Sequence, residues 1–281
     1  MRPPNEILLA ERVIALRHRL EATDLTPGAV VNSAFGELVT ICCRTPDATA
    51  TATLRHVTAH APAIRAICAT GETALEHHWS RRIAAAPDPR AELRRFPYLG
   101  NYRDLVRLEL GALAALGVPT PRRVVVAGSG PLPLTGLVLA ADHGAEVVHV
   151  DRDVASRHDG DKVTAALGLG DRVTSLCVDL AEPDPALDAA VARADVVVLA
   201  AMVGVDGPGK AAVSARLAAV LRPEARVVVR SANRLRTLLY PAVTPADLPG
   251  LTVLLEVHPA TDVVNSVLVA RPEETPGEVA R

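Results

Sequence analysis

The chain has 281 residues, of which 49% are hydrophobic, and a formal net charge of −2 at pH 7. This is enough for a sizeable core in one large domain or two modest ones. It gives no basic surplus for nucleic acid, no apolar run that could span a membrane and no secretory signal over residues 1–11, so we expect a cytoplasmic protein.

Residues 5–116 show helical periodicity. Apolar side chains from Ile7 to Leu20 fit one helical face. Further helices are expected around 38–41, 54–57 and 64–67, and over 72–83 and 101–116, with a break near Pro62. This part predicts an all-helical N-terminal domain over residues 1–119 that covers the active site.

From Pro121 onward, short β-branched runs alternate with helical stretches, which predicts a mostly parallel sheet with covering helices. The last two strands have no helix between them and indicate an antiparallel edge. The order of elements resembles the class I fold of methyltransferases that depend on S-adenosylmethionine (AdoMet), so we expect an α/β, Rossmann-like AdoMet-binding domain over residues 120–281. The expected strands cover residues 123–127, 146–150, 173–178, 195–200, 226–230, 251–257 and 263–270.

A glycine-rich turn, Gly128-Ser129-Gly130, follows the first predicted strand and would let backbone approach a ligand closely. A dinucleotide fingerprint needs a third glycine, where this chain has Pro133. Pro131 and Pro133 also lack the N–H donors that a pyrophosphate needs. The turn therefore favours a nucleoside cofactor without phosphates.

Acidic residues follow two further strands. Asp151 and Asp153 could accept hydrogen bonds from ribose hydroxyls, and Asp179 could meet the adenine amino group. The fourth strand runs into Ala200 and other small residues that would let a ligand lie against it. The alternative for each acid is a surface charge or a helix cap.

Several uncommon segments occur in order along the chain: LEHHW at 75–79, FPYLGNYRDL at 96–105, GSGPLPLT at 128–135, VVVLAAMVGVDGPGK at 196–210, RSANRLRTLLYP at 230–241 and HPATDVVNSVLVAR at 258–271. Through these segments the sequence resembles the nicotianamine synthase family over residues 70–270. The resemblance implies an enzyme that moves the 3-amino-3-carboxypropyl (aminobutanoyl) group of AdoMet to an amine and releases methylthioadenosine.

Four functions stay open within this resemblance. The short chain and its Ala/Arg/Val-rich composition favour a bacterial branch that transfers one unit to an amino acid, with histidine the expected acceptor, in metallophore biosynthesis. The alternatives are nicotianamine synthesis proper, which condenses three AdoMet molecules and closes an azetidine ring, an ordinary methyltransferase, and a non-catalytic AdoMet-binding module. Whether the chain forms a homodimer also stays open.

The resemblance places the catalytic residues at Glu76 and Tyr102, where a carboxylate or phenol would accept the proton of the attacking amine. Glu72, one helical turn earlier, is a weaker candidate. The alternative for Glu76 is an exposed carboxylate paired with Arg81 or His77, and the alternative for Tyr102 is core packing.

Tyr98 and Asn101 are expected to line the acceptor pocket. Arg230, Ser231 and Tyr240 could approach the substrate or the methionyl carboxylate, because an arginine suits a carboxylate. The alternative for Arg230 is a surface ion pair.

No catalytic metal is expected. His77 and His78 are adjacent on a helix and diverge by about 100°, so they do not readily share a metal. His258 is expected to bond locally. The cysteines at positions 42, 43, 68 and 177 form no C-x-x-C pair and are expected to be buried thiols.

Overall fold

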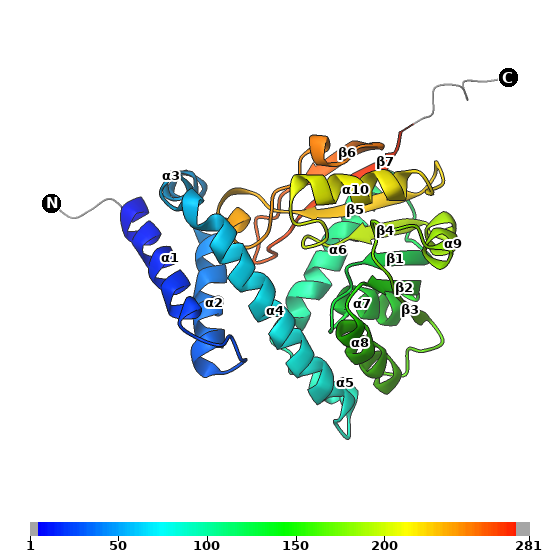
Figure 1. Cartoon of the computed structure of the whole chain (residues 1–281), viewed down its shortest axis with the longest axis horizontal. Helices are drawn as coiled ribbons and strands as arrows, with labels where there is room; N and C mark the ends of the chain where they lie inside the picture. The colour runs from blue at the N-terminus through cyan, green and yellow to red at the C-terminus, as the bar shows by residue number, and fades with distance from the viewer. Residues whose placement is uncertain (1–4, 274–281) are drawn as a thin grey trace.

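The computed structural model describes residues 5–273 and arranges them as a group of N-terminal helices beside a sheet with helices on both faces (Figure 1). The helices are α1 (Asn5–Glu21), α2 (Ala29–Arg44), α3 (Asp47–Val57), α4 (Ala61–Ala84), α5 (Pro89–Leu93), α6 (Leu99–Ala115), α7 (Leu134–His143), α8 (Val154–Ala166), α9 (Pro185–Arg193) and α10 (Gly207–Ala218), with short 3-10 turns η1 (Thr58–His60), η2 (Arg234–Leu238) and η3 (Pro245–Asp247). The strands are β1 (Arg123–Ala127), β2 (Glu146–Asp151), β3 (Val173–Cys177), β4 (Val196–Leu199), β5 (Arg226–Ser231), β6 (Leu251–Val257) and β7 (Ser266–Pro272).

Helix α4 differs from the sequence prediction. The helices expected around 64–67 and over 72–83 form one continuous helix of 24 residues. The break expected near Pro62 is present, since α3 ends at Val57 and α4 begins at Ala61, and proline is tolerated in this first turn, where no intrahelical N–H bond is lost. Gly71 lets α2 approach closely, since a Cβ there would lie 2.3 Å from a ring carbon of Phe35.

The sheet has seven strands in the order β3-β2-β1-β4-β5-β7-β6, and β7 pairs antiparallel with both of its neighbours. This topology confirms the predicted α/β, class I methyltransferase-like fold. The last strand begins at Ser266 instead of 263, because residues 258–265 form the turn between β6 and β7.

Alternate residues of the strands pack on opposite faces of the sheet, as a period of two requires. Val124 and Val126 of β1 join a core with α6, α7 and α8, whereas Val125 and Ala127 join a second core with α9 and α10. A third core joins α1, α2, α3 and α4 to η2. Over residues 5–273, no helix combines the length and the apolar character that a membrane crossing needs.

The carboxyl ends of the parallel strands are aligned. Ala127 of β1 pairs with Val150 of β2 and with Leu199 of β4. The loops after these strands therefore meet at one edge of the sheet, the usual ligand position of open α/β folds. Helix α4 crosses this edge and packs on α8 (Figure 1).

Candidate active site

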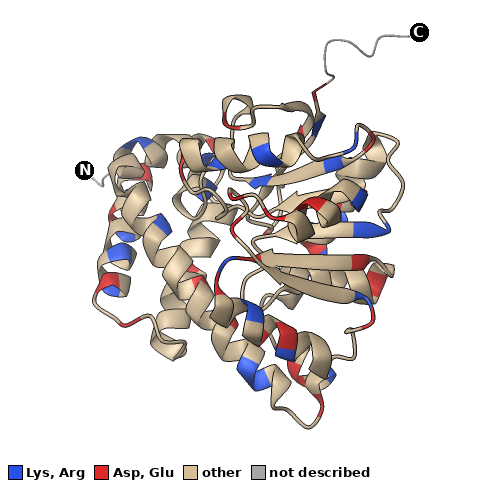
Figure 2. Ribbon diagram, turned by 45° about the vertical axis from the view of Figure 1, so that its right-hand side comes forward, with Lys and Arg blue, Asp and Glu red and all other residues tan. Residues whose placement is uncertain are grey.

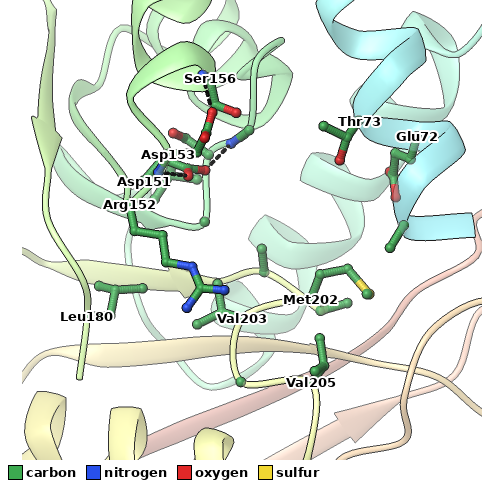
Figure 3. A pocket seen from close by; sticks show the side chains of 18 of the residues that line it. Glu72, Thr73, Asp151, Arg152, Asp153, Ser156, Leu180, Met202, Val203 and Val205 are labelled. Atoms are coloured by element: carbon green, nitrogen blue, oxygen red, sulfur yellow. Dashed lines mark hydrogen bonds between the residues drawn. The ribbon is translucent and has the colours of Figure 1, made fainter. Parts of the chain in front are cut away.

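Two cavities lie on either side of a wall formed by α4, α6 and two loops. The sheet-edge cavity has a volume of about 750 Å³ and is lined by the loops after β1, β2, β3 and β4. Figure 3 shows Glu72 and Thr73 of α4 facing Asp151 and Asp153 across this space. The helix-side cavity, of about 590 Å³, lies among α2, α4 and the segment 96–105. Five residues line both cavities and are called the shared wall: Glu72, Glu76, Tyr102, Tyr240 and Asn265.

The glycine turn brings backbone close to the shared wall. Gly128 and Gly130 have φ values of 79° and 70°, which side chains rarely adopt. A Cβ on Gly128 would lie 2.3 Å from Val203 Cγ2, and one on Gly130 would lie 2.5 Å from Glu76 Oε2. Both positions therefore require glycine for conformation and for space, and Ser129 lies between them in the same lining.

The acids predicted to bind a nucleoside all line the sheet-edge cavity. Asp151 accepts the Gly130 N–H at 2.8 Å and the Asp153 N–H at 3.0 Å, one on each carboxylate oxygen. Asp153 caps α8, and the N–H of Ser156 lowers its pKa, so the helix-cap alternative holds for this residue. Asp179 lies 3.5 Å from Arg152. Ala200, at the end of β4, completes this side of the lining.

Glu76 and Tyr102 meet in the shared wall, although they are 26 residues apart. The Tyr102 hydroxyl donates to Glu76 Oε1 at 3.3 Å, and Glu76 is only 9% exposed. Burial, and then the nearby Glu72, raises the pKa of Glu76 well above its ordinary value. The alternative for Glu76 does not fit, because His77 and Arg81 both bond to Asp159 Oδ2 at 2.8 Å. Tyr102 does pack against the sheet core, but its hydroxyl is directed to a carboxyl instead of the surface.

A second pair of the same kind lies one helical turn away. The Tyr240 hydroxyl lies 2.9 Å from both carboxylate oxygens of Glu72. Burial raises the pKa of Glu72, an effect that the Tyr240 hydrogen bond and the charge of Arg230 partly offset. Glu72, the weaker candidate from the sequence, thus lies in the shared wall beside a phenol, as Glu76 does.

Arg230 is buried instead of pairing at the surface. Its Nε donates to Glu109 Oε1 at 2.7 Å, and a terminal nitrogen donates to Thr135 Oγ1 at 2.7 Å, while the side chain still lines the sheet-edge cavity. Ser231 is a strand residue whose hydroxyl accepts the Val243 N–H at 2.8 Å, and it lines neither cavity. Glu109 was not predicted, since no local pattern marks it as the partner of Arg230.

Tyr98 and Asn101 line the helix-side cavity. Tyr98 continues an edge-to-face series of rings, at 5.8 Å from Phe96, which lies 5.4 Å from Trp79. The Asn101 amide donates to the Asp262 carbonyl at 2.8 Å and so ties α6 to the loop before β7. Neither residue lines the sheet-edge cavity, so these two fall on the side opposite the glycine turn.

Histidines and cysteines form no metal centre over residues 5–273, where no three His, Cys, Asp or Glu side chains gather as metal ligands. His258 bonds locally, with Nδ1 2.9 Å from Ser266 Oγ. The prediction of uniformly buried thiols is wrong: Cys42 is buried, but Cys177 is exposed because it ends the edge strand β3.

Comparison with known families identifies this arrangement. The family model described as "Nicotianamine synthase protein" matches residues 4–276. The chain belongs to the nicotianamine synthase family. Nicotianamine synthase 1 of Oryza sativa subsp. indica is 37% identical over 272 residues, which cover 94% of this chain and 80% of the relative. The nicotianamine synthase of Solanum lycopersicum is 33% identical, over 95% of this chain and 84% of the relative.

Solved structures agree on the fold. A glutamate-to-glutamine mutant of MtNAS superposes with a TM-score of 0.81 at 21% identity, over 97% of this chain and 99% of that one. A structure of MtNAS with MTA and tNA gives a TM-score of 0.80 at 24% identity, over 94% and 98% of the two chains. A third, of the mutant with S-adenosylmethionine, gives 0.78.

Membership in the family confirms the resemblance, and with it the prediction of an aminocarboxypropyltransferase. It favours nicotianamine synthesis, the alternative above, over a single transfer to histidine, because the matched relatives are nicotianamine synthases. Charged residues of both signs are interspersed along the chain, in line with the absence of a basic surplus (Figure 2).

Proposed function

We propose that this chain binds AdoMet in the sheet-edge cavity and transfers its 3-amino-3-carboxypropyl arm to an amine, in successive steps that produce nicotianamine. One observation carries the proposal: two carboxyl–phenol pairs, in which Glu76 is buried and the other three residues are half-buried, form the wall between a nucleoside-type cavity and a second, mostly apolar one. A wall of this kind holds proton acceptors between two substrates.

The residues of the sheet-edge cavity suit AdoMet. Asp151 ends β2, and lone pairs stay free on both of its carboxylate oxygens, as a ribose diol requires. Pro131 and Pro133 leave the turn short of the N–H donors that a phosphate needs. The volume of about 750 Å³ falls within the range of small-molecule sites.

AdoMet supplies a carbon made electrophilic by its sulfonium, so that attack by an amine nitrogen forms an N–C bond, breaks the S–C bond and releases methylthioadenosine. The chain must hold the attacking amine deprotonated and keep water away. Glu76, buried and bonded to Tyr102, is placed to take the amine proton.

The raised pKa values of the two glutamates fit this role. A buried carboxyl with a raised pKa is a stronger base toward an ammonium group than an exposed one. A positive charge nearby lowers the pKa of a carboxyl, so a cationic substrate in the cavity favours the ionised form of the base.

The helix-side cavity supports a place for the acceptor. It adjoins the same wall, and its lining includes the acceptor residues proposed above, Tyr98 and Asn101. Phe35 and Val39 of α2 face it from the N-terminal helices, in line with a helical domain that covers the active site.

The reaction is tested by incubating the purified chain with AdoMet alone and analysing both products by mass spectrometry. We expect methylthioadenosine and nicotianamine without any added amino acid. A requirement for histidine, with one transferred unit in the product, would establish the single-transfer function instead. Release of adenosylhomocysteine would contradict the aminocarboxypropyl class.

The roles of the wall are tested with Glu76→Gln and Tyr102→Phe. Loss of the proton acceptor should lower turnover by about 10²–10⁴-fold, while calorimetry should show AdoMet affinity within a few-fold of the parent. Glu21→Gln, at the exposed end of α1, is the control and should leave both unchanged. Turnover of Glu76→Gln within a few-fold of the parent would remove Glu76 from the role.

A further inference from the structure

Asn265 is a member of the shared wall that the sequence analysis did not single out. It precedes β7, in the turn 258–265, and is only 8% exposed. It lines both cavities, together with the two glutamates and the two tyrosines of the pairs described above. A buried asparagine in such a wall is placed to meet whatever passes between the cavities.

The amide nitrogen of Asn265 lacks a hydrogen-bond partner. Within the part of the chain that the structure describes, no group accepts a bond from its buried Nδ2. Buried polar groups in native proteins are nearly always satisfied, so an unpaired amide calls for an explanation. Apolar residues of similar size would fill the position without this cost.

The neighbouring turn is not loose. Arg44 forms two bonds to the Asp262 carboxylate, at 2.6 and 2.8 Å, and Arg236 donates to the Thr261 carbonyl at 2.7 Å. Asn101 holds the Asp262 carbonyl at 2.8 Å. The backbone that carries Asn265 is therefore fixed, and the unpaired amide is not the result of an unanchored segment.

The chemistry of the wall limits what Asn265 can bind. Its four companions are two carboxyls and two phenols, which suit an amine or a cation and repel a carboxylate. Arg230 is the cation of the sheet-edge cavity whose charge reaches Glu72, and two of its N–H groups are already bonded to Glu109 and Thr135. Amino-acid substrates carry a carboxylate as well as an amine, and that carboxylate needs a donor beside this acidic set.

We propose that Asn265 donates a hydrogen bond from Nδ2 to the α-carboxylate of an amino-acid substrate in the shared wall, and so positions it for transfer. The inference rests on the proposed function, whose substrates bear such carboxylates on both the transferred arm and the acceptor. Asn265 acts here as a substrate-positioning residue.

The test compares AdoMet with methylthioadenosine, which lacks the aminocarboxypropyl arm and with it the carboxylate, the ammonium group and the sulfonium charge. Calorimetry with both ligands separates the binding of the nucleoside from the binding of the arm. Asn265→Asp keeps the size of the side chain but replaces the donor with a negative charge. We expect it to weaken AdoMet binding by about ten-fold or more and to leave methylthioadenosine binding within about two-fold, because hydrogen bonds to charged groups are of that strength.

The acceptor arm of the experiment measures the KM of turnover, called the acceptor KM, with AdoMet itself as the amine acceptor that the proposed function requires. If AdoMet binding of Asn265→Asp is unchanged but the acceptor KM rises about ten-fold or more, the carboxylate belongs to the acceptor. Asn233→Asp, which lies outside both linings, is the matched control and should change neither value. Unchanged AdoMet affinity together with an unchanged acceptor KM would overturn the inference.

Asn265→Ala supplies a second readout that a structural role would not give. Removal of an unsatisfied buried amide should leave the thermal unfolding temperature unchanged or higher, while AdoMet binding or the acceptor KM worsens. A lower unfolding temperature, together with equal losses of affinity for AdoMet and for methylthioadenosine, would identify Asn265 as a structural residue and overturn the inference. If the parent binds neither AdoMet nor methylthioadenosine, the proposed function itself fails, and this inference with it.

Discussion

Replacement of Gly130 with alanine tests the geometry of the wall most directly. The new Cβ would lie 2.5 Å from Glu76 Oε2, whereas ordinary contacts begin near 3.4 Å. The carboxylate must therefore retreat by as much as 3.4 − 2.5 = 0.9 Å. A displacement of about 1 Å can cost about 10²-fold in rate when it misplaces a reacting group. We expect turnover of Gly130→Ala to fall by about that factor.

Gly144→Ala is the matched control. Gly130 and Gly144 have nearly the same φ, 70° and 71°, so alanine is equally strained at both positions, but a Cβ on Gly144 would meet nothing within 4 Å. Both variants should lose about 1–2 kcal/mol of unfolding free energy in urea titrations. Only Gly130→Ala should lose turnover.

The assay is single-turnover formation of methylthioadenosine at saturating AdoMet, which separates the transfer step from weaker binding. Equal turnover in the two variants would refute the contact between the glycine turn and Glu76. So would a Gly130→Ala enzyme that transfers at the parental rate.

Three further predictions concern buried charges. Burial lowers the pKa of His149 to about 3, so as the pH falls below 6.5 the unfolded chain takes up the proton before the folded chain does, and the free energy of unfolding should fall by about 2 kcal/mol by pH 5. His149→Leu should not show this fall in urea titrations at pH 7 and pH 5. An equal fall in the variant and the parent would contradict the prediction. Arg230→Met leaves Glu109 buried and unpaired, so its free energy of unfolding should be about 3–5 kcal/mol lower than that of the parent. The double variant Arg230→Met/Glu109→Leu should recover most of this loss. A single variant as stable as the parent would contradict the prediction. Lys210 donates to two carbonyls at the end of β4, each at 3.3 Å, so Lys210→Met should weaken methylthioadenosine binding about five-fold through the loop that Lys210 anchors. Lys162→Met, at an exposed position, is the control and should not weaken it. Equal affinities of the two variants would exclude a role of Lys210 in holding the loop.

The sheet was predictable because its signals are local. Runs such as Val124–Val126 lie between turn residues, and the strand-end rule placed Asp151 at the edge where the structure has it. The break near Pro62 was predictable because proline is favoured in the first turn of a helix, whereas no local pattern showed that the segments 64–67 and 72–83 form one helix.

The site was predictable only in part. Glu76 and Tyr102 were proposed from the family resemblance, and the structure places them together. The pairing of Arg230 with Glu109 joins residues 121 positions apart, so no local pattern reports it. Asn265 stands out only through a missing partner, which has meaning only once its surroundings are known.

The two cavities beside the shared wall are lined by different parts of the chain. Glycine turn and strand-end loops enclose one cavity, whereas Phe35 and Val39 of α2 border only the other. If the helix-side cavity holds the acceptor, as proposed, substitutions in α2 change the choice of amine and leave the glycine turn and the strand-end loops as they are. Relatives that share one nucleoside site would then differ in product through changes in a single N-terminal helix.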